Sequence, residues 1–325
     1  MYADTPPLRS HALPVGDGHV LQVQEFGRDG GIDAVMLHGG PGSGSSPLLR
    51  RVFDPARFRI VCIDQRGAGG SRPRGATDHN TTDHLLDDLR RVREHLGIAR
   101  WLVVGGSWGA ALALAHAAAE PGAVTALLLR ATFLARREDI EWFFQGAAAE
   151  HPVPWQQFAS AAPAERRHAL LPWLAEVFER GDQAQCARAA TAWWRWEQTV
   201  AGTGTFNSTP SADEATLIAR YCIQSHYLIH DCWLNEPPLL ARAASLPRVP
   251  MLLVHARDDR VCRPEGAQAL HLHLPHSQLR WLGSGGHNAA HPDMIDAMVT
   301  ALDLYAGHGV FSHDAARATL APTAP

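Results

Sequence analysis

The stretch LVVGGSWGAALALAHAAAE, residues 102–120, decides the fold. An apolar run enters Gly105, Gly106 and Ser107, and Gly109 opens an alanine-rich segment of helical composition. This is the G-x-S-x-G pattern, in which a serine stands on a sharp, strained turn between a strand and a helix. Glycines flank such a serine because side chains there would collide with neighbouring backbone. Ser107 is therefore a candidate nucleophile.

Two other uses of a glycine-rich turn compete with this interpretation: a turn whose serine only caps the helix, and a nucleotide-binding loop. A phosphate loop requires G-K-[ST], and a dinucleotide fingerprint requires G-x-G-x-x-G. Neither pattern is formed around Ser107. The buried strand before the turn and the helix after it are the context that the nucleophile turn requires.

Strand and helix signals alternate around this turn, which predicts an α/β fold with a mostly parallel central sheet. Strands are expected at 19–27, 33–40, 58–67, 101–106, 126–131, 250–256 and 279–284, and helices at 81–97 and 291–305. Between 132 and 245 the strand signals give way to helical segments rich in Ala and Trp. We therefore expect a core (1–131 and 246–305), an inserted helical cap (132–245) and a flexible C-terminal tail (306–325).

The composition limits which partners and which cellular compartment are expected. The 325 residues carry a net charge of -4 and 19% charged side chains, so nucleic acid is not an expected partner. The sequence contains no apolar run of about 18 residues, the length that a membrane-spanning helix needs. Five cysteines without a C-x-x-C pair indicate neither a disulfide framework nor a thiolate zinc site, and fit a reducing, cytoplasmic compartment. The oligomeric state is not predicted.

A serine hydroxyl is a weak nucleophile and needs a base and an acid that orients the base, in the chain order Ser, acid, His. Asp259 follows the apolar strand MLLVHA, and His287 follows the strand LRWLG. Each comes directly after a strand, as Ser107 does, so all three are expected at one edge of the sheet. Asp258 is a rival for the acid, and only its offset from the strand end disfavours it.

The glycine-rich segment HGGPGSG, residues 38–44, follows another expected strand. Acyl transfer needs N–H donors aimed at the developing oxyanion, and the backbone of Gly40 and of Trp108 is placed to supply them. The histidine run HLHLPH, residues 271–276, invites a metal site, but neither H-E-x-x-H nor a carboxylate set joins it. No metal and no cofactor are expected.

Several segments together resemble the prolyl aminopeptidase (proline iminopeptidase) family of α/β-hydrolases. They are HGGPG, DQRGAGGS, GGSWGAALALA, LLLRATF, VHARDDRVC and GSGGH, and the resemblance extends from about residue 10 to residue 305. It implies an α/β-hydrolase fold, a serine nucleophile at Ser107 with Asp259 and His287, and an oxyanion hole at Gly40 and Trp108. Family members release N-terminal proline from peptides, beneath a helical cap whose glutamates bind the imino nitrogen.

The resemblance also assigns the substrate pocket. WWRWE matches the family's W-x-x-W-E and implies that Glu197 binds the substrate's charged nitrogen, while Phe133, Phe144 and Cys262 would line the proline pocket. Where the family has a second glutamate in a stretch like IENHYF, this chain has IQSHYL, with Gln224 in the glutamate position. The expected substrate is a small peptide or an amino-acid amide or ester.

Two alternatives remain beside a prolyl aminopeptidase. One is the same chemistry on another amino-acid-derived or specialised metabolite, which Gln224 favours, as does Leu228 in the phenylalanine position of the same stretch. The other is a homologue that binds a ligand without turnover. The apparent presence of all three triad members disfavours the second.

Overall fold

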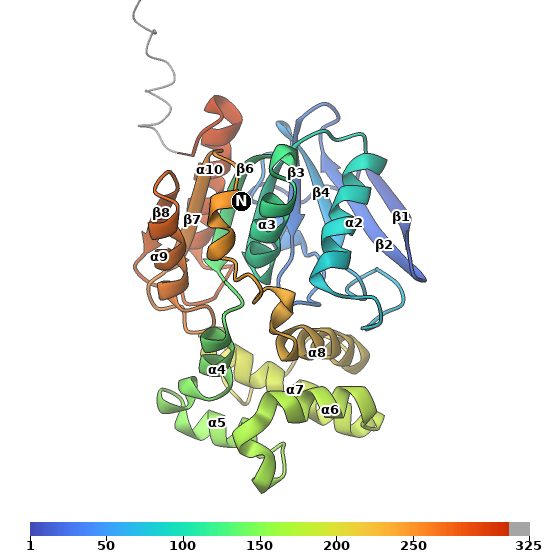
Figure 1. Ribbon diagram of the computed structural model, residues 1–325, viewed down its shortest axis with the longest axis vertical. Helices are drawn as coiled ribbons and strands as arrows, with labels where there is room; N and C mark the ends of the chain where they lie inside the picture. The colour runs from blue at the N-terminus through green and yellow to red at the C-terminus, as the bar shows by residue number, and fades with distance from the viewer. Residues whose placement is uncertain (312–325) are drawn as a thin grey trace, which may run out of the picture.

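A central β-sheet organises the protein (Figure 1). The structure is a computed structural model that describes residues 1–311. Eight strands of this part of the chain form one sheet in the order β1-β2-β4-β3-β5-β6-β7-β8. Their bounds are β1 (Arg9–Gly16), β2 (His19–Gly27), β3 (Ile32–Leu37), β4 (Phe58–Asp64), β5 (Trp101–Ser107), β6 (Val124–Thr132), β7 (Met251–Ala256) and β8 (Gln278–Leu282). The pairs β1–β2 and β2–β4 are antiparallel and the others are parallel, which confirms the predicted mostly parallel sheet.

Helices cover both faces of the sheet, so its central strands are apolar on both sides. One face packs against α2 (Thr82–His95), α3 (Trp108–Ala119) and α9 (Pro264–His273), and the other against α1 (Pro47–Arg50) and α10 (Pro292–His308). Strand β5 is buried over its first six residues and leads directly into α3, whose alanines allow close packing on the sheet. This places the end of β5 at the centre of one edge.

Five helices between β6 and β7 gather beyond that edge, in the lower part of Figure 1. They are α4 (Arg137–Phe144), α5 (Pro152–Ala159), α6 (Leu170–Arg180), α7 (Gln183–Val200) and α8 (Glu214–Ile229). Their shared interior is aromatic: Trp193 and Trp196 are fully buried and lie against Tyr221 and Phe158. Helices were expected between residues 132 and 245. The division of the chain into a core and a helical cap at these boundaries stays a prediction.

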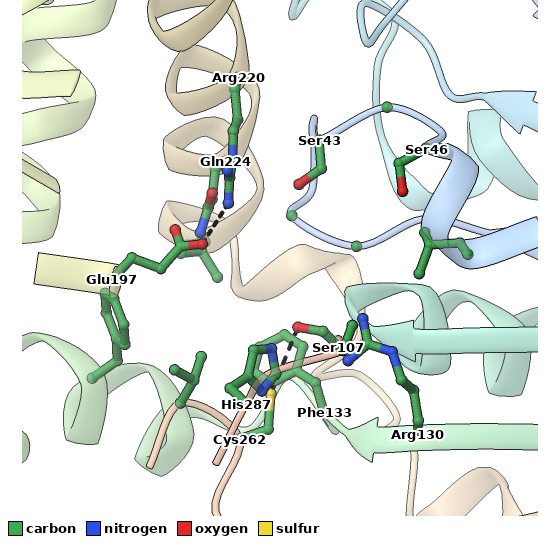
Figure 2. A pocket seen from close by; sticks show the side chains of 18 of the residues that line it. Ser43, Ser46, Ser107, Arg130, Phe133, Glu197, Arg220, Gln224, Cys262 and His287 are labelled. Atoms are coloured by element: carbon green, nitrogen blue, oxygen red, sulfur yellow. Dashed lines mark hydrogen bonds and ion pairs between the residues drawn. The ribbon is translucent and has the colours of Figure 1, made fainter. Parts of the chain in front are cut away.

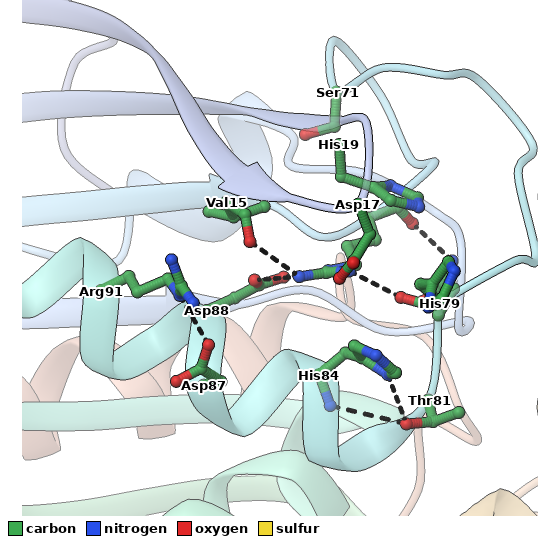
Figure 3. A network of polar contacts seen from close by, with 12 residues as sticks. Val15, Asp17, His19, Ser71, His79, Thr81, His84, Asp87, Asp88 and Arg91 are labelled. Atoms are coloured by element: carbon green, nitrogen blue, oxygen red, sulfur yellow. Dashed lines mark hydrogen bonds and ion pairs between the residues drawn. The ribbon is translucent and has the colours of Figure 1, made fainter.

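Polar contacts attach these helices to the core. The Tyr227 hydroxyl, on α8, donates to Asn80 Oδ1 at 2.8 Å. Asn80 lies in the loop before α2, and Figure 3 shows the network that holds this region. There the buried Arg66 guanidinium binds both oxygens of Asp88 at 2.8 Å and donates to the carbonyl of Val15. Because the guanidinium nitrogens of Arg66 and both oxygens of Asp88 are paired, the two charges can be buried here.

The ends of the chain differ from the sequence prediction. Strand β1 was not expected, because its side chains are mostly exposed and show no apolar alternation; it forms through its hairpin with β2. The predicted tail begins too early, since α10 continues to His308 and Phe311 is buried against Tyr305. The rest of the predicted tail, 312–325, lies outside the described residues. Within residues 1–311, no helix combines the length and apolarity needed to cross a bilayer.

Candidate active site

Ser107 stands on a strained turn between β5 and α3. Its backbone has φ 56° and ψ -123°, a region that costs a non-glycine residue free energy and persists only where the surroundings impose it. A Cβ on Gly109 would lie 2.2 Å from the carbonyl oxygen of Leu37, and one on Gly105 would lie 2.2 Å from that of Gly109. Close backbone packing therefore explains both glycines and holds the serine above the sheet.

Asp259 and His287 form a hydrogen-bonded pair. His287 Nδ1 lies 2.8 Å from Asp259 Oδ2, and the other carboxylate oxygen accepts the backbone N–H groups of Val261 and Cys262 at 2.9 Å each. Burial by itself raises the pKa of the Asp259 carboxyl, but the adjacent His287 and these N–H donors outweigh burial, and the net pKa is lowered. Asp259 is therefore ionised at neutral pH and can only accept, so Nδ1 of His287 is the donor.

The rival acid, Asp258, has a different place. Its carboxylate is exposed and accepts the backbone N–H groups of Gly285 and Gly286 at 3.2 and 2.9 Å. Asp258 thus holds the loop that carries His287 but does not bind the imidazole. The geometry brings Asp259, and not Asp258, to the histidine.

Ser107 and His287 open into one cavity of about 320 Å³ beneath the helices between β6 and β7 (Figure 2). In the described part of the chain, the Ser107 hydroxyl contacts Cys262 Sγ at 3.7 Å and forms no hydrogen bond with His287. Burial raises the pKa of the Cys262 thiol well above its ordinary value, so the thiol stays neutral. Catalytic hydrogen bonds are often loose before substrate binds, and a turn of the serine side chain would exchange one partner for the other.

The glycine-rich loop lies against the serine, as expected. A Cβ on Gly39 would be 3.5 Å from that of Ser107, and both Gly39 and Gly40 line the cavity. Trp108 is the first residue of α3, where a backbone N–H has no partner within the helix. The sequence pointed to Gly40 and Trp108 and missed the proximity of Gly39.

Buried side chains hold this loop in place. The Trp108 indole donates to Gln65 Oε1 at 2.8 Å, and Gln65 Nε2 donates to the carbonyl of His38 at 3.0 Å. His38 also accepts the Gln65 backbone N–H at Nε2, while its Nδ1 lies 2.9 Å from the carbonyl oxygen of Gly39. Burial lowers the pKa of His38, which keeps the neutral form that this pair of bonds requires.

The far end of the cavity carries the residues expected to bind a substrate amine. Arg220 donates to Oε1 of Glu197, and the Tyr221 hydroxyl donates to Oε2 at 3.0 Å. Gln224 and Leu228 also line the cavity, and the amide oxygen of Gln224 is buried and has no hydrogen-bond partner among residues 1–311. Arg220 was missed, although it precedes Gln224 by four residues and so shares its helix face.

The residues that line the cavity differ in part from those expected to form the proline pocket. Phe133 and Cys262 line the cavity, whereas Phe144 does not. Phe144 is 3% exposed and packs edge-to-face on Trp193, in the interior of the helices; its neighbour Phe143 lines the cavity instead. Consecutive residues of a helix point about 100° apart, which explains why only one of the two phenylalanines of α4 lines the cavity.

The histidines of the run near 271–276 do not line the cavity. In the run near 271–276, His271 Nδ1 lies 2.9 Å from Ser277 Oγ, and His273 Nδ1 lies 2.9 Å from a helix carbonyl. Within residues 1–311, the group whose atoms could hold a metal ion is Asp17, His79 and His84, with ligand atoms within 4.8 Å of one another (Figure 3). None of these residues lines the cavity.

Comparisons with known proteins agree with this architecture. Residues 35–293 match the family model described as the alpha/beta hydrolase fold. Solved structures share the fold: VinJ has a TM-score of 0.62 at 19% identity, covering 92% of this chain and 99% of VinJ, and the proline iminopeptidase of Mycobacterium smegmatis has a TM-score of 0.56 at 19% identity, covering 93% of this chain and 100% of that chain. Fold and comparison together define an α/β-hydrolase.

Curated relatives identify the family of α/β-hydrolases to which the chain belongs. The proline iminopeptidase of Xanthomonas citri is 38% identical over 310 residues, covering 94% of this chain and 99% of the relative. That of Arabidopsis thaliana is 37% identical, covering 93% of this chain and 80% of the relative. The chain belongs to the proline iminopeptidase family, which confirms the resemblance drawn from the motifs.

Proposed function

We propose that the protein is a serine hydrolase that releases an N-terminal residue, proline in the first instance, from peptides or amides. The observation that carries the proposal is the shared cavity of Ser107 and His287, with His287 bound to the buried carboxylate of Asp259. This arrangement of nucleophile, base and orienting acid is the one that acyl transfer requires.

The proposed reaction uses the groups that share this cavity. His287 takes the proton of the Ser107 hydroxyl as its oxygen attacks the scissile carbonyl, and the backbone N–H groups of Trp108 and of the Gly39–Gly40 loop receive the oxyanion. His287 then gives the proton to the leaving nitrogen, and an acyl-enzyme forms. Water, activated by His287, releases the amino acid. Asp259 stays ionised throughout and stabilises the imidazolium.

The cap helices supply the reason for cleavage at a chain end. Glu197 and Gln224, on α7 and α8, line the cavity together with Ser107, and in this proposal they receive the terminus of the substrate. The carboxylate of Glu197 offers charge-assisted hydrogen bonds to an N-terminal amine. Peptides are thus the proposed partner, and Phe133 and Phe143 provide apolar walls for a small ring.

A second candidate is an amidase or esterase whose acyl group carries no amine. The pairing of Arg220 with Glu197 favours it, because Arg220 already neutralises the carboxylate on which recognition of an amine depends. Gln224 adds no charge of its own. Both candidates share the same chemistry at Ser107 and differ only in what the cap end binds.

Hydrolysis of four substrates separates these candidates: prolyl-β-naphthylamide, alanyl-β-naphthylamide, N-acetyl-prolyl-β-naphthylamide and p-nitrophenyl acetate. Ser107→Ala serves as the blank, and a fluorophosphonate labels an active serine. Turnover of the free-amine prolyl substrate alone supports the iminopeptidase. Cleavage of the ester alone, with Ser107 labelled, supports the second candidate. Turnover retained in Ser107→Ala, or an unlabelled Ser107 without turnover, contradicts the serine mechanism.

We also propose a cytoplasmic location. All five cysteines carry free thiols, and four of them are buried. Free thiols without disulfides are typical of a reducing compartment.

A further inference from the structure

Arg130 is a buried cation without a partner, directly beside the nucleophile. It lies on β6 and is 9% exposed, and its Nε and Nη1 atoms are buried and form no hydrogen bond with any residue that the structure describes. Within residues 1–311 no carboxylate forms an ion pair with it. A Cβ on Gly106 would lie 2.5 Å from Arg130 Nε, so the glycine before Ser107 makes room for this guanidinium.

A charge in such a place is costly unless something pairs with it. Burial lowers the pKa of Arg130, although Asp259 and Cys262 oppose this effect. Asp259 is already bound to His287 and two backbone N–H groups, so it does not serve as the missing partner. Arg130 lines the cavity, and the missing partner can therefore come from the substrate.

The position of Arg130 tells which part of the substrate it meets. Figure 2 shows Ser107 between two groups of side chains, with Glu197 and Arg220 on one side and Arg130 on the other. In the proposed function the amine of the substrate lies at Glu197, so the leaving group extends past Ser107 in the direction of Arg130. The α-carbon of the leaving residue is one residue length, about 3.8 Å, from that of the residue released.

The second cationic side chain of the cavity, Arg220, does not compete for this role. Its charge is matched by Glu197, and it lies at the acyl end. With two arginines and one carboxylate, Glu197, in the lining, the cavity has a surplus positive charge, and that surplus lies with Arg130.

We propose that Arg130 binds the free α-carboxylate of the leaving residue, so that the preferred substrates are dipeptides rather than longer or C-terminally blocked peptides. This inference rests on the proposed function, because the amine at Glu197 sets the direction of the substrate. The guanidinium and the carboxylate are planar groups that form paired hydrogen bonds. In a dipeptide the carboxylate is attached to the α-carbon that follows the scissile nitrogen, which brings it to the arginine.

The test compares prolyl-alanine, prolyl-alanine amide and prolyl-alanyl-alanine by kcat/KM in each variant. The wild type is expected to favour the dipeptide over its amide by about ten- to a hundredfold, as charge-assisted hydrogen bonds allow. In Arg130→Met this ratio is expected to fall to near one, and Arg130→Lys should keep part of it. Arg220→Met is the matched control: it removes the cation at the other end, and the dipeptide-to-amide ratio should persist.

Ratios within one variant cancel any general loss of active protein. A wild-type ratio near one, a longer peptide equal to the dipeptide, or a preference that survives in Arg130→Met overturns the proposal. Circular dichroism checks folding; if Arg130→Met does not fold, the wild-type ratio and Arg130→Lys decide.

Failure of the proposed function is recognised separately, by prolyl-β-naphthylamide. If that substrate is cleaved while the dipeptide ratio is one, the function stands and the role of Arg130 falls. If no prolyl substrate is cleaved, N-acetyl-alanine and its amide are compared as protectants of Ser107 against the fluorophosphonate. Stronger protection by the carboxylate, lost in Arg130→Met, supports the arginine site, and equal protection overturns it.

Discussion

Arg220, on α8, and Glu197, on α7, form an ion pair at one end of the cavity that holds Ser107. The Tyr221 hydroxyl occupies the second oxygen of the same carboxylate. An N-terminal amine that enters this end must therefore share Glu197 with an arginine rather than meet a free charge. We therefore expect this pairing to weaken the binding of an amine, and the neutral Gln224, which also lines the cavity, adds no charge to offset it.

Restoring a charge at position 224 should strengthen amine recognition. Gln224→Glu is expected to raise kcat/KM for prolyl-β-naphthylamide by about tenfold, because a second carboxylate offsets Arg220 and binds the ammonium. Hydrolysis of p-nitrophenyl acetate, which has no amine, is the control and should not rise in parallel. An unchanged or lower prolyl rate would show that this end of the cavity does not bind the amine.

The acid of the proposed triad can be tested against its neighbour. Asp259→Asn should lower kcat by about three to four orders of magnitude, since the amide cannot stabilise an imidazolium and favours the wrong tautomer. Asp258→Asn, the matched control, loses only part of its contact with the loop at 285–286 and should change kcat by less than about tenfold. Equal losses in the two variants would argue against the assignment of Asp259.

The turn at Ser107 depends on backbone contact. Gly109→Ala places a Cβ 2.2 Å from the carbonyl oxygen of Leu37, a central strand residue that cannot retreat. We expect a loss of at least about 2 kcal/mol in the free energy of unfolding, and loss of fluorophosphonate labelling. Gly122→Ala, where nothing lies within 4 Å, is the control and should be nearly neutral. Wild-type stability in Gly109→Ala would contradict the structure of the turn.

Stability should decline in mild acid because of His116. The Trp101 indole donates to its Nε2 at 3.1 Å, and burial lowers the pKa of His116 to about 4. An unfolded histidine has a pKa of about 6.5, so between these values the unfolded chain binds a proton that the folded chain does not. Folding free energy is therefore lost as the pH falls, by about 2 kcal/mol from pH 7 to pH 5.

Urea unfolding at the two pH values measures this effect. In His116→Gln the corresponding loss should be smaller by about the same amount, while the exposed His276→Gln should behave as the wild type. A pH dependence that is identical in wild type and His116→Gln would exclude His116 as its source.

Much of the site could be predicted from local patterns. The turn around Ser107 can be recognised in the sequence because only glycine tolerates the backbone contacts at positions 105 and 109. Asp259 and His287 could be found because each lies in a loop that follows a strand, β7 and β8, and the carboxyl ends of parallel strands meet at one edge. The choice between Asp258 and Asp259 could not be settled in the same way, since adjacent residues differ only in the direction of their side chains.

The sequence by itself thus determined most strands of the sheet, the serine turn and the chain order of the candidate nucleophile, acid and base, because these depend on apolar runs and on backbone chemistry between near neighbours. Only the tertiary structure decided that Arg220 pairs with Glu197, that Phe143 rather than Phe144 lines the cavity, and that Arg130 lies against Gly106 with no ion-pair partner among residues 1–311. Each of these contacts depends on side chains that the fold brings together from separate elements. A local sequence pattern therefore does not determine which residue will lie next to a buried group.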